Sequence, residues 1–182
     1  HVLNHSLFKS LLFLAAGSVL HATGTRRISS LGGLARTMPH TFVLFLIGAV
    51  AICGLPPLNG FASELLLYMG LLRAGGDTPQ GWAWASLAAP VLAMIGALAV
   101  ASFVKVAGVA FCGSARSSGA AHAHDPGRGM LAPMGMLAGA CMLLGLFPGA
   151  AVPMLQRAVA AWDPALGGAR SRARLAPRAR DD

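Results

Sequence analysis

Residues 38–72 read MPHTFVLFLIGAVAICGLPPLNGFASELLLYMGLL, and this stretch decides the fold. It is longer than the roughly 20 apolar residues that a helix needs to cross the hydrocarbon core of a bilayer. Pro56 and Pro57 stand side by side within it. Because two adjacent prolines remove two backbone donors and clash with the preceding helical turn, no continuous helix passes through this point. The stretch is therefore either two short spans or one span built from two half-helices.

We favour one broken span over residues 38–73, with Pro56, Pro57 and Gly60 as its hinge. Backbone that is broken at membrane depth is tolerated only where protein buries it or where it lines a wet cavity. Discontinuous helices of this kind recur at the ion sites of transporters. The break therefore predicts a functional site, and Glu64 follows it after one helical turn.

Three further apolar segments, at about 2–22, 84–112 and 130–152, are long enough to cross a bilayer. Trp82 and Trp84 suit an interfacial aromatic belt at the start of the middle one. We predict an all-α, polytopic transmembrane helix bundle over residues 1–155. Residues 156–182 are expected to form an interfacial segment and a basic, disordered tail.

The composition agrees with lipid as the solvent. Apolar residues make up 55% of the chain and charged residues 11%, whereas soluble domains carry about 25% charged residues. The net charge of +8 comes from loops and the tail, and not from a basic face with aromatic residues, so we exclude a nucleic-acid partner. The chain begins at His1, inside an apolar helix pattern and without a charged leader, so we expect a piece of a longer protein.

The charges of the loops predict the orientation. If 38–73 is one broken span, the loops 23–37 and 113–128 share a side and hold five arginines, whereas the loop 74–81 holds no basic residue. The five-arginine side then faces the cytoplasm. The arginine-rich tail falls on the other side, which conflicts with this rule. Two spans in 38–73 would remove that conflict but would put the arginines of the 113–128 loop outside.

His1, His5 and Lys9 follow one another at four-residue spacing. Four residues turn an α-helix by about 40° beyond a full turn, so the three side chains line one helix face. Imidazole titrates near neutrality, and a Lys partly removed from water has a lowered pKa. We predict that this stripe is part of a proton path. The alternative is that the basic groups simply reach toward the membrane interface.

Glu64 and Lys105 complete the set of ionisable candidates within the spans. A charge at the bilayer centre costs about 2.5–3.5 kcal/mol on insertion scales, so each one is informative. Glu64 suits the dipole at the start of the second half-helix; its alternative is an ordinary helix start near the membrane surface. Lys105 either takes part in ion transfer or snorkels toward the polar loop at Gly113. We assign both to the proton path.

No metal site is predicted. The run His122-Ala-His124-Asp125 favours a solvated loop over a weak metal site. The three cysteines lie in or beside apolar runs without CxxC spacing and suit packing positions. They are Cys53, Cys112 and Cys141.

Three stretches resemble a known family. HVLNHSLFKSLLFLAAGSVLHATGTR (1–26) and GGLARTMPHTFVLFLIGAVAICGLPPLNGFASE (32–64) are similar to the antiporter-like subunits of complex I and of the related cation/proton antiporters. ASFVKVAGVAFCG (101–113) and the sequence that follows it resemble the branch of hydrogenase-4 component B and the formate hydrogenlyase membrane subunit. The resemblance covers roughly residues 1–155.

The resemblance implies a non-redox subunit of the plasma membrane that moves protons or sodium ions. Glu64 falls where members carry a Lys or Glu at the terminal proton site, and Lys105 falls where this branch carries a Lys. The family's earlier Glu and Lys would precede His1. No cofactor is expected on this chain, because iron–sulfur clusters, a nickel–iron module or a quinone site would belong to partner subunits. The expected partners are those peripheral redox subunits, other membrane subunits and the lipid bilayer.

Two other functions remain open. One is a subunit of a secondary cation/proton antiporter, which shares the site chemistry but lacks a redox partner. The other is a structural anchor for a peripheral enzyme, in which polar side chains hold helices together.

Overall fold

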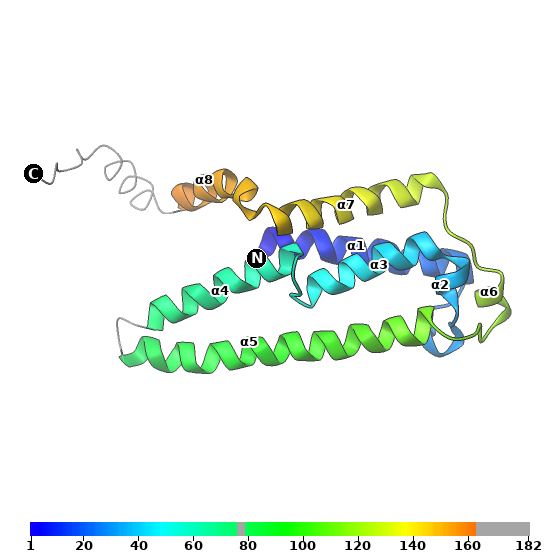
Figure 1. Ribbon diagram of the computed structural model, residues 1–182, viewed down its shortest axis with the longest axis horizontal. Coiled ribbons are helices and arrows are strands. Elements are labelled where there is room, and N and C mark those ends of the chain that lie inside the picture. The colour runs from blue at the N-terminus through cyan, green and yellow to red at the C-terminus, as the bar shows by residue number, and fades with distance from the viewer. Residues whose placement is uncertain (76–78, 163–182) are drawn as a thin grey trace, which may run out of the picture. The chain divides into compact units, whose positions relative to one another are not determined.

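The computed structural model describes residues 1–75 and 79–162, and every regular element in them is helical (Figure 1). The long helices are α1 (Val2–Thr23), α3 (Pro39–Ile52), α4 (Asn59–Gly75), α5 (Pro79–Val106), α7 (Arg128–Leu146) and α8 (Val152–Trp162). Shorter turns are η1 (Ile28–Ser30), α2 (Leu34–Thr37), η2 (Ala107–Phe111), α6 (Ser118–Ala121) and η3 (Pro148–Ala151). The prediction of an all-α fold is confirmed. The expected disorder of the tail after Trp162 lies outside the described residues.

The helix break lies where the proline pair predicts it. α3 ends at Ile52 and α4 begins at Asn59, with the cis peptide bond Pro56–Pro57 between them. Figure 1 shows α3 and α4 following one another in the same direction, with α5 running back beside α4. The two half-helices therefore form one broken segment and not a hairpin.

Within residues 1–75 and 79–162, three helical stretches are long and apolar enough to cross a membrane, namely Val2–Thr23, Trp82–Phe111 and Arg128–Leu146. α3 has 14 residues and is too short alone, about 21 Å at 1.5 Å per residue. Placed one after the other, α3 and α4 provide the length for crossing a bilayer that α3 alone lacks.

α1 packs between α3 and α7, and the shared core lies along these three helices. Small residues let the helices approach: a Cβ on Gly48 of α3 would stand 3.0 Å from the Leu12 side chain of α1. Phe111 of η2 closes one end of the core, where its ring lies 4.9 Å from that of Phe45. The buried members include Leu11, Ala15, Val19, Ala49, Met134 and Ala138.

Two helix boundaries differ from those expected, and proline explains both. α5 starts at Pro79, where a loop up to Gly81 was expected, because proline is well suited to the first helical position. α7 ends at Leu146, earlier than the expected end near 152, because Pro148 cannot donate to the helix and starts the turn η3 instead. The described residues up to Leu146 form one compact unit, and Phe147 to Trp162 belong to another.

Candidate site at the helix break

Two glycines pack the break backbone against backbone, and a third glycine turns the chain there. A Cβ on Gly60 would overlap the carbonyl oxygen of Ala51, and a Cβ on Gly145 of α7 would overlap the carbonyl oxygen of Pro57. Gly54 has φ 63°, a left-handed conformation that L residues rarely adopt. Protein therefore covers the break at Leu58, Asn59 and Gly60, whereas Leu55, Pro56 and Pro57 are exposed.

Glu64 is half-buried, and its carboxylate lies back over the break. A Cβ on Gly54 would overlap the Oε2 atom of Glu64 and would stand 2.7 Å from its Cδ and 2.9 Å from its Oε1. The missing side chain of Gly54 thus provides the space that the carboxylate occupies. Leu65 and Leu66 are 46% and 61% exposed, so they form the outer face of α4. Glu64 belongs to the break and not to this apolar face.

His1 reaches from α1 to the first turn of α4. Its Nδ1 atom lies 3.0 Å from the hydroxyl oxygen of Ser63, which precedes Glu64 in the chain. The same hydroxyl donates to the carbonyl oxygen of Gly60 at 3.0 Å. Because that bond uses the only hydroxyl proton, His1 donates from Nδ1 in this arrangement, which leaves Nε2 as the acceptor nitrogen of the neutral ring.

Asn4 and Asn59 form a second link between α1 and α4. The amide of Asn4 donates to the backbone carbonyl of Asn59 at 3.0 Å, and the amide of Asn59 donates to the side-chain oxygen of Asn4 at 3.2 Å. Asn59 is fully buried, and within the described part of the chain its Oδ1 atom has no hydrogen-bond partner. Sequence reasoning missed both residues, although an amide in an apolar segment is a recognisable signal.

The histidine stripe is partly assembled. The rings of His1 and His5 are 5.8 Å apart, and both lie against the buried ring of Phe8 at 6.4 and 5.1 Å. Lys9 is exposed, one turn further along α1. In residues 1–75 and 79–162 no hydrogen bond or ion pair involves the side chain of Lys9. The structure thus brings His1 and His5 to the break and leaves Lys9 on the outer surface of α1.

Lys105 lies at the other end of α1. It lines a cavity of about 500 Å³ together with Ile28 and Ser29, which follow the C-terminal end of α1. His1 stands at the N-terminal end of the same helix, which has 22 residues and is about 33 Å long. The structure therefore does not bring Lys105 to Glu64.

Asp125 ties the loop before α7 to the start of α3. Its Oδ1 atom accepts hydrogen bonds from the backbone N–H of Thr41 at 2.9 Å and from the Thr41 hydroxyl at 2.8 Å. Its Oδ2 atom accepts from the backbone N–H of His40 at 3.0 Å and lies 2.9 Å from the Nδ1 atom of the His40 ring. Burial acts to raise the pKa of Asp125, but these hydrogen bonds outweigh it and leave the pKa lowered. The loop expected for His122 to Asp125 is present, with both histidines exposed, and Asp125 is its partly buried member, whose partners come from a distant helix start.

We expect Asp125→Ala to destabilise the protein by about 1–2 kcal/mol, the effect of losing a helix N-cap. Asp125→Asn should lose less, since one side-chain oxygen still accepts. Because folding lowers the pKa from 3.8, the stabilisation is present above that value and is lost as the pH falls through the folded pKa. Thermal unfolding in detergent between pH 7 and pH 3 measures this. Equal acid sensitivity of the wild type and Asp125→Ala would contradict it.

Comparison with known proteins identifies the family. Residues 1–96 match the family described as NADH:quinone oxidoreductase/Mrp antiporter, transmembrane. The chain belongs to this family. It is accordingly a multi-pass membrane protein of the antiporter-like type, and the resemblance read from the sequence is confirmed.

Two curated relatives and one solved structure place it more closely. Hydrogenase-4 component B of Escherichia coli K12 is 41% identical over 147 residues, which are 80% of this chain and 22% of that protein. Formate hydrogenlyase subunit 3 of the same strain is 42% identical over 163 residues, 87% of this chain and 26% of that protein. The Mrp complex from Dietzia sp. DQ12-45-1b has a chain that is 25% identical with a TM-score of 0.63, covering 79% of this chain and 33% of that one. The chain spans about a quarter of the length of these two curated relatives.

Proposed function

We propose that this chain is part of the proton-translocating subunit of a redox-driven membrane assembly of the hydrogenase-4 or formate hydrogenlyase type. The observation that carries the proposal is the Glu64 carboxylate lying over the helix break, next in sequence to the Ser63 hydroxyl that His1 contacts. A carboxyl group and an imidazole at one break supply two sites that bind and release a proton. The sequence identity of 41% to hydrogenase-4 component B and of 42% to formate hydrogenlyase subunit 3 supports the choice of this type of assembly.

The proposed path runs along one face of α1 to the break. Lys9 and His5 hand protons toward His1, whose Nε2 accepts while its Nδ1 stays on Ser63. The Glu64 carboxylate then accepts the proton and becomes a neutral carboxylic acid. It releases the proton on the far side of the break and returns to the carboxylate. Lys105 lies at the other end of α1, so it exchanges no proton directly with Glu64.

We further propose that the chain carries no redox centre. The iron–sulfur, nickel–iron or quinone sites would then belong to peripheral partner subunits, and the driving reaction would reach this subunit through neighbouring membrane subunits. In the described residues no three His, Cys, Asp or Glu side chains gather as metal ligands.

A secondary cation/proton antiporter is the second candidate, favoured by the structural match to an Mrp complex. Both candidates use the same site, and they differ in what drives the ion. In an antiporter the gradient of one ion drives the movement of the other, whereas electron transfer drives the hydrogenase-type assembly.

The test is ion movement by the complete native assembly in proteoliposomes. Adding the electron donor should change the internal pH, reported by an enclosed dye, and a protonophore should abolish the signal. Proton movement that follows an imposed sodium gradient without electron transfer would instead support the antiporter. Normal electron transfer without any ion movement would overturn both and leave the structural anchor. Co-purifying iron–sulfur subunits would identify the redox partner.

A further inference from the structure

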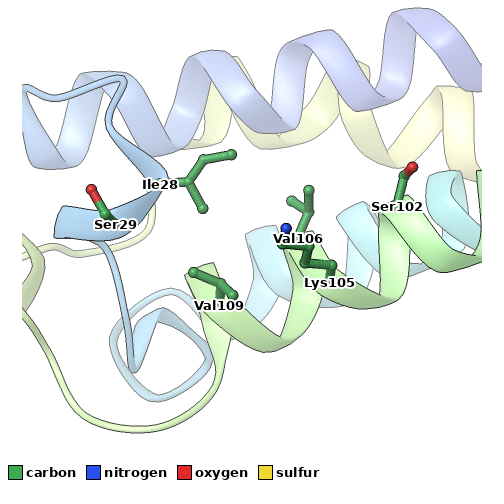
Figure 2. A pocket seen from close by; sticks show the side chains of 6 residues that line it. All are labelled: Ile28, Ser29, Ser102, Lys105, Val106 and Val109. Atoms are coloured by element: carbon green, nitrogen blue, oxygen red, sulfur yellow. The ribbon is translucent and has the colours of Figure 1, made fainter.

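We propose that the cavity around Lys105 binds the anionic headgroup of a membrane phospholipid. This site lies apart from the helix break, and the inference does not depend on proton transfer. Figure 2 shows Ser102, Lys105, Val106 and Val109 along α5 and η2, with the Ile28 side chain pointing toward them from η1.

The residues that line the cavity suit an amphipathic ligand, which has a charged headgroup and an apolar tail. Lys105 is its one charged side chain, and Ile28, Val106 and Val109 give it apolar walls. No ion pair of the residues that the structure describes engages Lys105. The hydroxyl of Ser102 donates its proton to the carbonyl of Leu98 at 2.8 Å. Ser102 is uncharged, so it does not neutralise the ammonium group of Lys105. A phosphate oxygen would pair with Lys105, and the first acyl methylenes would lie on the walls.

The depth of Lys105 matches the headgroup layer. Trp82 and Trp84, 58% and 72% exposed, mark the opposite end of the same apolar run. From residue 84 to residue 105 there are 105 − 84 = 21 residues, which span about 31 Å of helix. The hydrocarbon core is about 30 Å thick. When the tryptophans lie at one interface, Lys105 therefore lies at the other.

Three arginines lie next in sequence to the residues that line the cavity or bond to them. Arg26 and Arg27 precede Ile28 in the same loop. The guanidinium of Arg116 donates to the carbonyls of Leu31 at 3.0 Å and Val109 at 2.9 Å. It thereby ties the η1 loop to η2 while keeping its positive charge. Such basic groups at a membrane surface attract anionic lipids, by about 1 kcal/mol each, or about fivefold in affinity.

The test is lipid binding by the complete subunit in its native assembly, purified in detergent and followed by native mass spectrometry. Phosphatidylglycerol should bind more tightly than phosphatidylcholine. Lys105→Gln should weaken phosphatidylglycerol binding about fivefold, and Lys105→Arg should retain it. Lys9→Gln is the matched control, because Lys9 is the other lysine of the chain and lies outside the cavity.

Three outcomes would overturn the proposal. The first is equal loss of phosphatidylglycerol in Lys105→Gln and Lys9→Gln, and the second is no preference over phosphatidylcholine. The third is competition by millimolar inorganic phosphate that displaces the lipid completely, which would make the cavity a site for free phosphate. If Lys105→Gln fails to assemble, Ile28→Asn alters the apolar wall and should weaken the lipid without changing phosphate binding. Bound lipid is the readout, so the result is independent of whether Glu64 carries protons.

Discussion

Replacing Glu64 by Gln should reduce proton movement by the assembled complex at least tenfold, while electron transfer in detergent stays unchanged. The amide has the size of the carboxyl group and fits the same space beside Gly54. It cannot bind and release a proton near neutral pH, so the path is cut without altering the packing. A factor of ten corresponds to about 1.4 kcal/mol on the barrier. Dye-reported proton uptake in proteoliposomes, divided by electron-transfer rate, measures it.

Two further variants make the Glu64 result specific. Glu64→Asp keeps a titratable group and should retain part of the proton movement. Leu66→Gln changes a neighbouring position on the outer face of α4 and should leave the ratio unchanged. Unchanged proton uptake in Glu64→Gln would remove Glu64 from the path. Parallel loss of assembly and uptake would instead support a structural role for the polar side chains.

The elements that local chemistry controls were predictable from the sequence. Two adjacent prolines prohibit a continuous helix wherever they stand, so the break followed from Pro56 and Pro57 alone. The position of Glu64, one helical turn after Gly60, followed from its place in the sequence. The helical periodicity that puts His1 and His5 on one face is likewise a local property.

The contacts that complete the site join residues far apart in the chain, and no local pattern reveals them. Asn4 meets Asn59 and Thr41 meets Asp125 across long sequence separations. The distance between Lys105 and Glu64 also depends on how α5 lies beside the other helices. Sequence reasoning grouped the two because both are ionisable residues within predicted spans, whereas the structure places Lys105 near the C-terminal end of α1 and the break near its N-terminal end.

The break combines rigid packing with one unsatisfied group. Gly60 packs directly against the backbone of Ala51, and Gly145 packs against that of Pro57 and Leu58. The Oδ1 atom of Asn59 nevertheless lacks a donor in the portion of the chain described, at a cost of about 1–3 kcal/mol for a buried acceptor. A buried acceptor of this kind favours any rearrangement that brings it a donor.

Gly54→Ala should reduce proton movement nearly as much as Glu64→Gln, because the new methyl group would occupy the space of the carboxylate. The substitution also puts an L residue at φ 63°, which costs about 1–2 kcal/mol by itself. Gly24→Ala separates these effects. Gly24 has φ 69° and nothing within 4 Å of an added Cβ, so it carries the same backbone strain without touching Glu64.

The double variant Gly54→Ala with Glu64→Asp decides between displacement and strain. Asp is one methylene shorter, so its carboxylate withdraws from the added methyl group, whereas the backbone strain at residue 54 remains. We expect the double variant to move protons faster than Gly54→Ala alone, with thermal stability in detergent no higher than that of the single variant. If instead Gly24→Ala and Gly54→Ala lose proton movement equally, or if Glu64→Asp gives no rescue, Gly54 acts through the backbone and does not position the carboxylate. The choice of glycine at residue 54 would then reflect the left-handed turn alone, since φ 63° suffices to require it.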